Sequence, residues 1–479
     1  MELIPYLLLL VVVIVFGLLF GRLRRRFHRK KDQLRDVETE EARMFRFLHR
    51  LGEAIGSDTS NESLYRIIVD GIDEVVSATG GAIYLLDDKK EFLVPKYLSA
   101  DCPALIGVPQ EIRRKAERDP RAMSSYLQLT QVPIEHGILG DALAKGTAVH
   151  ITGLREHESF RDALHGFGAD SDLEVQVAPL RHGGKDLGVL AVARHVGETA
   201  FTANDISVFR SAAEQSAFAL GNALLYREAH EKRQIEGDLR NASEVQRVLL
   251  PQESPVIPGY RVHGTNIPAR IISGDYYDHL ELANGHHGVV IADVSGKGVA
   301  AGLLMAMCRS VLRAKAGDSN DPAEVLGKVN RLLFPDIRED MFVSLFYGVI
   351  VAETGTIRLA RAGHDPALLY RAQSRSIEML KPQGLALGVD EGDVFERITR
   401  TVEVELSAGD CLLFYTDGIQ EATNGGGEEF GIERLKETFQ ENASLGAEAS
   451  VAAVQRAVMR FAGDGRQMDD ITMLALERR

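Results

Sequence analysis

The sequence predicts a multidomain α+β protein: a single transmembrane helix, an α/β sheet domain, a coiled-coil linker, and a β-rich domain built as a sheet sandwich. Three observations predict this arrangement. An uncharged apolar run lies near the N-terminus, two long regions mix strand-like and helix-like apolar patterns, and a charged stretch with helical periodicity separates those regions. The length of 479 residues is enough for about three domains of roughly 150 residues each.

Composition excludes some function classes. A formal net charge of −14 argues against a nucleic-acid-binding surface unless the charges are strongly segregated. Cys102, Cys308 and Cys411 lie too far apart in the sequence for a disulfide framework or a zinc cluster, and a reducing compartment is the simplest account.

Residues 1–21 are predicted to anchor the chain in a membrane. Leu3 to Gly21 is a run of 19 residues without a charge, and at about 1.5 Å per residue it just spans about 30 Å of hydrocarbon. Arg22 to Lys31 then has seven Lys and Arg residues and no acid, so this flank is expected on the cytoplasmic side, with the N-terminus outside and the remaining chain cytoplasmic. A cleaved signal peptide is the alternative, but it needs basic residues before the apolar run and small residues at a cleavage site after it.

Residues 22–56 are predicted to hold a basic flank and a signalling helix. Apolar residues recur there at alternating spacings of three and four, a heptad pattern broken by one acid: Leu34, Val37, Glu41, Met44, Leu48, Leu51 and Ile55. Two interpretations remain open: an amphipathic helix packed on its own domain, or a helix of a parallel homodimer. Membrane confinement raises the effective concentration and favours the homodimer.

Residues 57–226 are predicted to form a sheet flanked by terminal helices. "GGAIYLLDDKKEFLVPKYL" predicts two strands, and "LEVQVAPLRHGGKDLGVLAVARH" predicts a hairpin turning at Gly183 and Gly184. A long helix follows, capped near Thr202 or Asn204. This order of elements, with "LAKGTAVHI" and "AAEQSAFALGNALLY", resembles a GAF domain.

A GAF-like domain implies a small-molecule sensor or a dimerisation module, and the sequence names no ligand. His150, His165 and His182 are scattered, and we expect them to be solvated or paired with backbone groups rather than to bind haem or metal.

Residues 227–250 are predicted to form a helical, coiled-coil linker that Pro251 ends. The stretch is highly charged and then regains an apolar seam: Ile235, Leu239, Ala242, Gln246 and Leu249. Its position between two globular units suggests that it transmits a rotation or a change of register.

Residues 251–479 contain seven strand-like apolar runs, with helical patterns at Val299 to Ala316 and Pro322 to Leu333. Such a β-rich unit is expected to form a sheet sandwich with helices outside. Acids mark several strand ends, next to glycine or other small residues: Asp275, Asp278, Asp293, Asp417, Asp469 and Asp470.

These acids predict a metal site. Carboxylates that converge in a buried place repel each other, and few Lys or Arg residues lie within these segments to pair with them. Divalent cations resolve the conflict, and ligands that are all oxygen favour Mg²⁺ or Mn²⁺ over zinc. Two such ions can activate a water molecule for attack on a phosphoryl group. "SGKG" at residues 295–298 fails the Walker A pattern because Ile291 and Gly298 occupy two of its required positions. Gly296 and Gly298 are instead expected to allow a sharp turn.

Six motifs in order carry a resemblance to a known family: "PARIISGDYYD", "IADVSGKGVAAGLLMA", "ARAGHDPALLY", "GLALGV", "LFYTDGIQEA" and "DDITMLAL". They resemble the SpoIIE-like bacterial branch of the metal-dependent, type 2C (PPM) serine/threonine phosphatases. The resemblance implies an α-β-β-α sandwich phosphatase domain with two divalent ions, Mn²⁺ or Mg²⁺, at one edge.

The resemblance also implies roles for single residues. Asp293 matches the acid that bridges both ions, and the carbonyl of Val294 matches a backbone ligand. Asp275, Asp417 and Asp469 match the remaining ligands. The supporting residues implied are Asp278 behind the ligands, Asp470 in the turn, and Arg270 as a phosphate-binding arginine. Ser273 departs from the usual glycine.

The expected function is therefore a membrane-anchored, sensor-regulated phosphatase that hydrolyses phosphoserine or phosphothreonine on a cytoplasmic regulatory protein. The resemblance implies a STAS-type anti-sigma-factor antagonist as the substrate. The alternative is a non-catalytic signalling scaffold that binds a phosphoprotein.

Overall fold

The computed structural model describes most of the chain after the N-terminal segment. The described residues are 39, 41–54, 60–99, 102, 105–106, 109–116, 118–119, 121–134, 137–153, 173–195, 200–282, 285–351, 354–463, 465 and 467–479. None of the described helices combines the length and the hydropathy that a bilayer-spanning helix needs. The predicted anchor at residues 3–21 lies outside the described residues.

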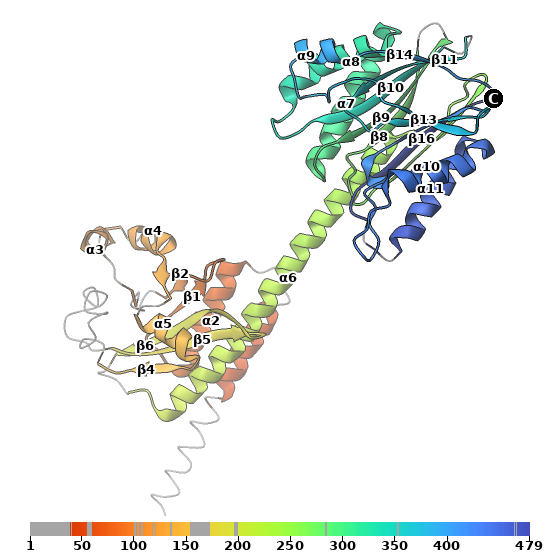
Figure 1. The fold of residues 1–479 in the computed structure, drawn as a ribbon. Helices are drawn as coiled ribbons and strands as arrows, with labels where there is room; N and C mark the ends of the chain where they lie inside the picture. The colour runs from red at the N-terminus through yellow and green to blue at the C-terminus, as the bar shows by residue number, and fades with distance from the viewer. Residues whose placement is uncertain are drawn as a thin grey trace, which may run out of the picture. The chain divides into compact units, whose positions relative to one another are not determined.

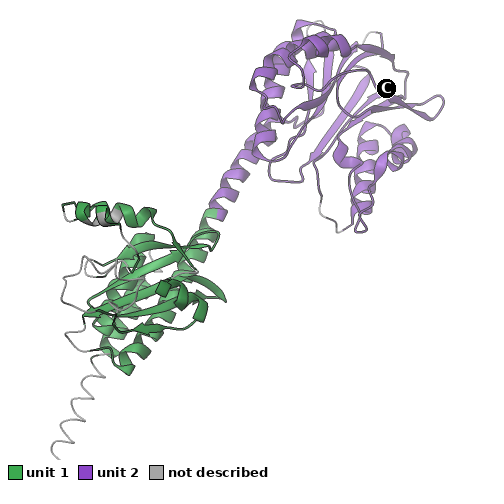
Figure 2. Cartoon of the chain, turned by 60° about the vertical axis from the view of Figure 1, so that its left-hand side comes forward, with its two compact units in different colours: residues 1–231 green, residues 232–479 purple. Residues whose placement is uncertain are grey.

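The chain divides into two compact units, residues 1–231 and residues 232–479 (Figure 2). Each unit has its own sheets and its own cores of buried apolar side chains.

The first unit is built on an antiparallel sheet with strand order β3-β2-β1-β6-β5-β4 (Figure 1). Its strands are β1 (Gly80–Leu86), β2 (Phe92–Leu98), β3 (Val132–Pro133), β4 (Val149–Ile151), β5 (Leu173–His182) and β6 (Lys185–His195). Its helices are α2 (Asn61–Val76), α3 (Gln110–Ala116), α4 (Arg121–Leu129), α5 (Gly137–Lys145) and the first part of α6 (Ala203–Leu249). Both predicted hairpins are present, and the second one turns at Gly183 and Gly184.

Two apolar cores cover the two faces of this sheet. Side chains of α2 and α6 pack on one face, and α5 with the segment around Leu105 packs on the other. The helix at residues 41–54 contributes Leu51 to the first core, with Met44 packed against it, whereas Leu48 is 39% exposed. The described part of the heptad pattern therefore packs in part on its own domain, as one of the two interpretations held.

Of the three histidines singled out in this unit, His150 and His182 are described and have partners within it. The Nε2 atom of His150 lies 2.8 Å from the buried carboxylate of Glu174. The ring of His182 packs edge-on against Phe218 at 5.5 Å. His150 is exposed and His182 is partly exposed, so both rings also reach solvent, as the sequence predicted. His165 lies outside the described residues.

Helix α6 runs without interruption from Ala203 to Leu249 and includes the predicted linker. A reciprocal cap starts it: Thr202 Oγ1 accepts from Asp205 N at 3.1 Å, and Asp205 Oδ2 accepts from Thr202 N at 2.8 Å. Of the predicted linker seam, Gln246 is buried, whereas Ile235 is 60% exposed.

The second unit is a four-layer α-β-β-α sandwich of two five-stranded antiparallel sheets (Figure 1). One sheet has the order β14-β11-β10-β9-β8, and the other has the order β13-β12-β15-β16-β7. The strands are β7 (Tyr260–Ile267), β8 (Tyr276–Glu281), β9 (His287–Val294), β10 (Val343–Val351), β11 (Thr356–Ala362), β12 (Ala367–Arg371), β13 (Ser376–Leu380), β14 (Val402–Glu405), β15 (Cys411–Tyr415) and β16 (Ile471–Arg478). The helices are α7 (Val299–Lys315), α8 (Pro322–Leu333), α9 (Asp393–Ile398), α10 (Gly431–Asn442) and α11 (Ala447–Ala462), with four short 3-10 helices at Ala316–Asp318, Phe334–Asp336, Asp417–Ile419 and Ala443–Leu445.

Apolar side chains that alternate between the two faces of each strand produce these layers. In β9, Val289 and Ile291 point into the core between the sheets, and Val290 and Ala292 point toward α7 and α8. Phe346 of one sheet meets Phe414 of the other at 5.1 Å between ring centroids. Helices α10 and α11 cover the outer face of the second sheet. Asp321 caps α8 through its Oδ1, which accepts from Ala323 N at 3.0 Å.

The seven predicted strands and the two predicted helices of this unit are present. The sequence analysis missed β8, β13, β14 and α9 to α11. The omission of β8 matters most, because Asp278 lies within this strand rather than in a loop.

Candidate metal centre

Four predicted ligand acids come from four strand ends in both sheets. Asp275 directly precedes β8, and Asp293 is the penultimate residue of β9 in the same sheet. Asp417 starts the short helix after β15, and Asp469 lies just before β16 in the other sheet. The charge of Asp293 raises the pKa of Asp275 and of Asp417, and the charge of Asp469 raises that of Asp293 and of Asp417, so the structure brings all four acids together.

Burial and mutual repulsion raise the pKa values of these acids and so favour their protonated forms. Asp275 is 2% exposed, and burial followed by the charge of Asp293 raises its pKa well above the usual value. Burial, and then the charge of Asp469, raises the pKa of Asp293 to about 6. Burial, and then the charge of Asp293, raises the pKa of Asp417 to about 7. A cation among the acids would lower all of these pKa values.

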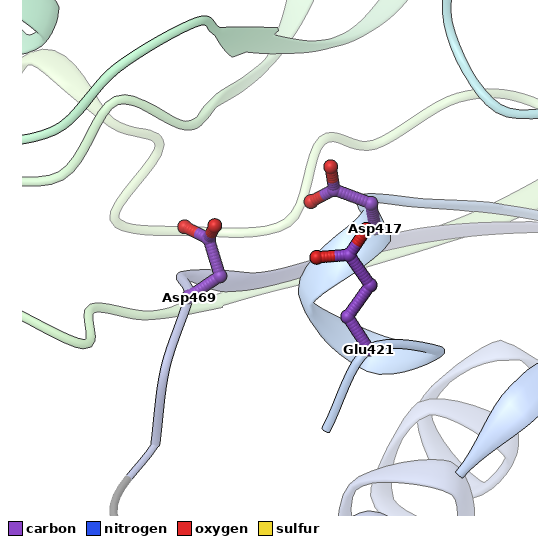
Figure 3. A group of neighbouring side chains, drawn as sticks. All are labelled: Asp417, Glu421 and Asp469. Carbon is purple, nitrogen blue, oxygen red and sulfur yellow. The ribbon is translucent and has the colours of Figure 1, made fainter. Parts of the chain in front are cut away.

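Glu421 joins the cluster although the sequence analysis did not single it out. Carboxylate oxygens of Asp417, Glu421 and Asp469 all lie within 4.8 Å of one another. Figure 3 shows Asp417 and Glu421 on one short helical segment and Asp469 on a separate strand of chain beside it. The spacing of four residues within the quoted "TDGIQEA" motif was the available signal, because one helical turn places both acids on the same face.

A second missed acid, Asp365, lies near the cluster. Its charge raises the pKa of Asp293 and of Asp417, although other causes contribute more. Gln420 Nε2 donates to its Oδ2 at 2.7 Å. The neighbouring His364 is buried, and burial lowers its pKa to about 3, so the ring is neutral. Its Nδ1 lies 2.7 Å from Ser344 Oγ, and Ser344 pairs with Asp293 across strands β10 and β9.

Hydrogen bonds fix the loop that carries Asp275. Thr416 Oγ1 donates to Asp275 Oδ2 at 2.8 Å. Asp470, predicted to support the turn, accepts from Ala269 N at 2.7 Å, from Ser273 Oγ at 2.7 Å and from Gly274 N at 2.9 Å. Its carboxylate therefore ties this loop to the start of β16.

The end of α6 contacts the same loop. Gln246 Nε2 donates to Ser273 O at 2.6 Å, and Ser273 N donates to Gln246 Oε1 at 2.9 Å. A cavity of about 310 Å³ adjoins this contact, and Gln246, Asn266, Ile271 and Ser273 are among the residues that line it. The predicted linker thus contacts Ser273, which lies two residues before the predicted metal ligand Asp275.

Glycines allow the close approaches that the centre needs. A Cβ on Gly274 would lie 3.1 Å from the Val294 carbonyl oxygen, the predicted backbone ligand. A Cβ on Gly418 would lie 2.0 Å from the Asp470 carbonyl oxygen, a distance that no side chain tolerates. Gly296 and Gly298 have φ angles of 90° and 85°, as the predicted sharp turn requires.

The predicted support from Asp278 is wrong. Its buried carboxylate points toward α7, where Arg313 Nε and Nη2 each donate to it at 2.7 Å. Tyr276 also donates to its Oδ2 at 2.6 Å. Because β8 is a strand, residues 276 and 278 share the face that packs on α7, and this residue anchors that helix instead.

Arg270 is exposed on the loop between β7 and β8. Across the described residues, no ion pair joins it to an acid of the cluster; the cation that does pair there is Lys297, 2.7 Å from Asp469 Oδ2.

The donor set fits divalent metal ions. It consists of carboxylate oxygens and, in the predicted ligand set, the Val294 carbonyl, which are the ligands that Mg²⁺ and Mn²⁺ prefer. The raised pKa values of Asp275, Asp293 and Asp417 show that the acids are short of positive charge. The assignment of single residues as metal ligands stays a prediction.

Comparisons with known proteins agree with this architecture. Residues 283–479 match the family model described as stage II sporulation protein E (SpoIIE), and residues 58–221 match the model of a GAF domain. The chain is 25% identical over 297 residues to phosphoserine phosphatase RsbU of Bacillus subtilis (strain 168), covering 61% of this chain and 86% of that protein.

Two further likenesses are more partial. The chain is 28% identical over 296 residues to protein IcfG of Synechocystis sp. (strain ATCC 27184 / PCC 6803 / Kazusa), covering 54% of this chain and 46% of that protein. Among solved structures, the SiaA-PP2C domain of Pseudomonas aeruginosa aligns with a TM-score of 0.45 and 23% identity, covering 52% of this chain and 99% of that one.

Proposed function

We propose that this chain is a serine/threonine phosphatase that hydrolyses phosphoserine or phosphothreonine on a regulatory protein, since its residues 283–479 match the SpoIIE family model, its residues 58–221 match a GAF domain, and it is similar to phosphoserine phosphatase RsbU. The observation that carries the proposal is the convergence of Asp275, Asp293, Asp417 and Asp469 from both sheets. Proteins of this class need divalent metal ions, and the acidic cluster offers them a place.

We propose that two ions bind here, Mn²⁺ or Mg²⁺. Asp293 and the Val294 carbonyl, with Asp275, Asp417 and Asp469, would hold them. When bound, such ions supply an activated water molecule and neutralise charge that develops on the phosphoryl group.

The chain's own residues keep the acids in place for this chemistry. Thr416 orients Asp275 through a 2.8 Å hydrogen bond. Asp470 fixes the loop before Asp275 through three donors from that loop. A structure with these bonds already formed holds the acids close together before any ion arrives, which lowers the cost of organising the site.

We propose a phosphorylated STAS-type anti-sigma-factor antagonist as the substrate, within a partner-switching circuit. The similarity to phosphoserine phosphatase RsbU supports phosphoserine as the group that is hydrolysed. We further propose that residues 3–21 anchor the chain in the cell membrane, with the N-terminus outside, and that the coiled-coil segments form a homodimer. A ligand of the GAF domain would regulate the phosphatase through α6, whose Gln246 contacts the loop before Asp275.

A non-catalytic scaffold that only binds a phosphoprotein is the second candidate. The presence of all four acids counts against it, since a binding module does not need a cluster of mutually repelling carboxylates.

Phosphate release from a phosphoserine peptide by the full-length chain in detergent tests the proposal. We expect release with Mn²⁺, no release with EDTA, and no release by Asp293→Ala. Asp318→Ala is the matched control, because Asp318 pairs with Lys315 on the surface. Undiminished release by Asp293→Ala rejects the assignment, and phosphopeptide binding without turnover in any divalent ion favours the scaffold.

A further inference from the structure

Among the described residues, Lys297 is the basic residue that forms an ion pair with a predicted ligand acid of the cluster. It lies in the turn between β9 and α7, between two glycines with positive φ angles. Its Nζ lies 2.7 Å from Asp469 Oδ2 and donates to Met468 O at 2.8 Å. Its side chain is 37% exposed, so the ammonium group reaches solvent as well as the acids.

The negative charge of the cluster favours a basic side chain beside it. The four predicted ligands and Glu421 carry five negative charges when all are ionised, and two divalent ions supply four positive charges. A phosphate monoester adds about two negative charges near neutral pH. The site with both ions bound therefore still has a net negative charge, which repels the phosphate monoester unless a further cation takes part.

The two contacts of Lys297 leave it available for that task. An ammonium group has three donors, and the described residues provide acceptors for two of them. Asp469 is a predicted metal ligand, and a metal ion coordinated by its oxygens would weaken the ion pair between Lys297 and that carboxylate. Four rotatable bonds then let the ammonium group move by a few ångströms without any change of the backbone.

Arg270 is the rival for the same task, since its position in the sequence matches the phosphate-binding arginine of the type 2C relatives. It is exposed, and across the described residues it forms no ion pair with the cluster. Lys297, in contrast, is held beside Asp469 by a turn that directly follows Val294 in β9.

We propose that Lys297 binds the phosphate group of the substrate, exchanging Asp469 for a phosphate oxygen when that carboxylate ligates metal. This inference rests on the proposed phosphatase function. The turn at residues 295–298 does not match the Walker A pattern, but in this proposal the side chain of Lys297 within it contacts phosphate.

Three variants of the full-length chain test the proposal: Lys297→Met, Lys297→Arg, and Lys328→Met as the matched control. Lys328 forms an exposed pair with Glu324 on α8 and lies outside the cluster. Two quantities are measured by calorimetry, Mn²⁺ binding to the metal-free chain and binding of inorganic phosphate to the Mg²⁺-loaded chain. Turnover of a phosphoserine peptide is measured separately.

We expect Lys297→Met to weaken phosphate binding by about 10-fold or more, as the loss of a charge-assisted hydrogen bond predicts. Lys297→Arg should restore most of it, and Lys328→Met should match the wild type. Binding of Mn²⁺ by Lys297→Met should be unchanged or tighter, because a competing cation has been removed from Asp469.

Two results overturn the proposal. One is unchanged phosphate binding by Lys297→Met, and the other is loss of its Mn²⁺ binding, which would make Lys297 a structural support of Asp469. A wild type that binds phosphate through Lys297 without turnover would instead reject the phosphatase function and leave this inference standing.

Discussion

Binding of Mn²⁺ to the metal-free protein is predicted to release protons, and more of them at pH 6 than at pH 8. The reason lies in the two acids whose raised pKa values fall in this range, about 6 for Asp293 and about 7 for Asp417. A carboxylate must lose its proton before it ligates a metal ion, so the ion displaces whatever protons these acids hold.

The size of the effect follows from those two pKa values. At pH 6 Asp293 holds about 0.5 proton and Asp417 about 0.9, and at pH 8 the two together hold about 0.1. Proton release should therefore fall by about 1.3 protons between pH 6 and pH 8, and the apparent Mn²⁺ affinity should rise about 20-fold.

Calorimetric titration in two buffers of different ionisation enthalpy measures the protons released at each pH. Asp417→Asn is the matched variant: it removes the acid with the larger share, so the release at pH 6 should fall by about 0.9 proton. Equal proton release at pH 6 and pH 8 in the wild type would refute the reasoning, because the acids would then be ionised before the metal arrives.

Four further outcomes are expected. Burial raises the pKa values of Asp293 and Asp417, so the metal-free folded state binds protons more tightly than the unfolded chain. Their contribution to stability is present below about pH 4 and is lost as the pH rises through 6 to 7; the Tm in EDTA should fall between pH 5 and pH 8, and a flat profile contradicts this. Asp278→Ala leaves Arg313 and Tyr276 without their shared acceptor and should lower the free energy of unfolding by about 3 kcal/mol in urea titrations; no change would mean that this pair is energetically neutral. Gly418→Ala drives a Cβ into the Asp470 carbonyl and should abolish Mn²⁺ binding by calorimetry, whereas Gly426→Ala, with only the Asn424 side chain near its Cβ, should not. Gln246→Ala removes both hydrogen bonds to Ser273 and should weaken Mn²⁺ binding at least a few-fold, while Gln252→Ala, which loses bonds within the same segment, serves as the control.

The sequence was most informative where local pattern decides structure. Val289 to Ala292 alternate between two apolar cores, and an acid stands at the end of that strand. Both facts are readable without coordinates, because a strand with two buried faces is a continuous apolar run and an acid there is conspicuous.

Sequence reasoning failed where a polar residue pairs with a partner far along the chain. Asp278, three residues after Asp275, was predicted to support the metal ligands, but its carboxylate accepts hydrogen bonds from Arg313 of α7. Strand β8 was also missed, because Asp278, His279 and Glu281 interrupt the apolar run by which the other strands were found.

From the sequence alone follow the multidomain α+β organisation, the strands that end in acids, and the prediction that oxygen ligands hold divalent metal ions, because these depend on residue type and short-range periodicity. Only the tertiary structure decided which acids meet, since Asp275, Asp417 and Asp469 are separated by up to 194 residues and converge through the packing of two sheets. It also added Glu421, Asp365 and Lys297 to the site, because a charge acquires a role only from the groups that lie beside it.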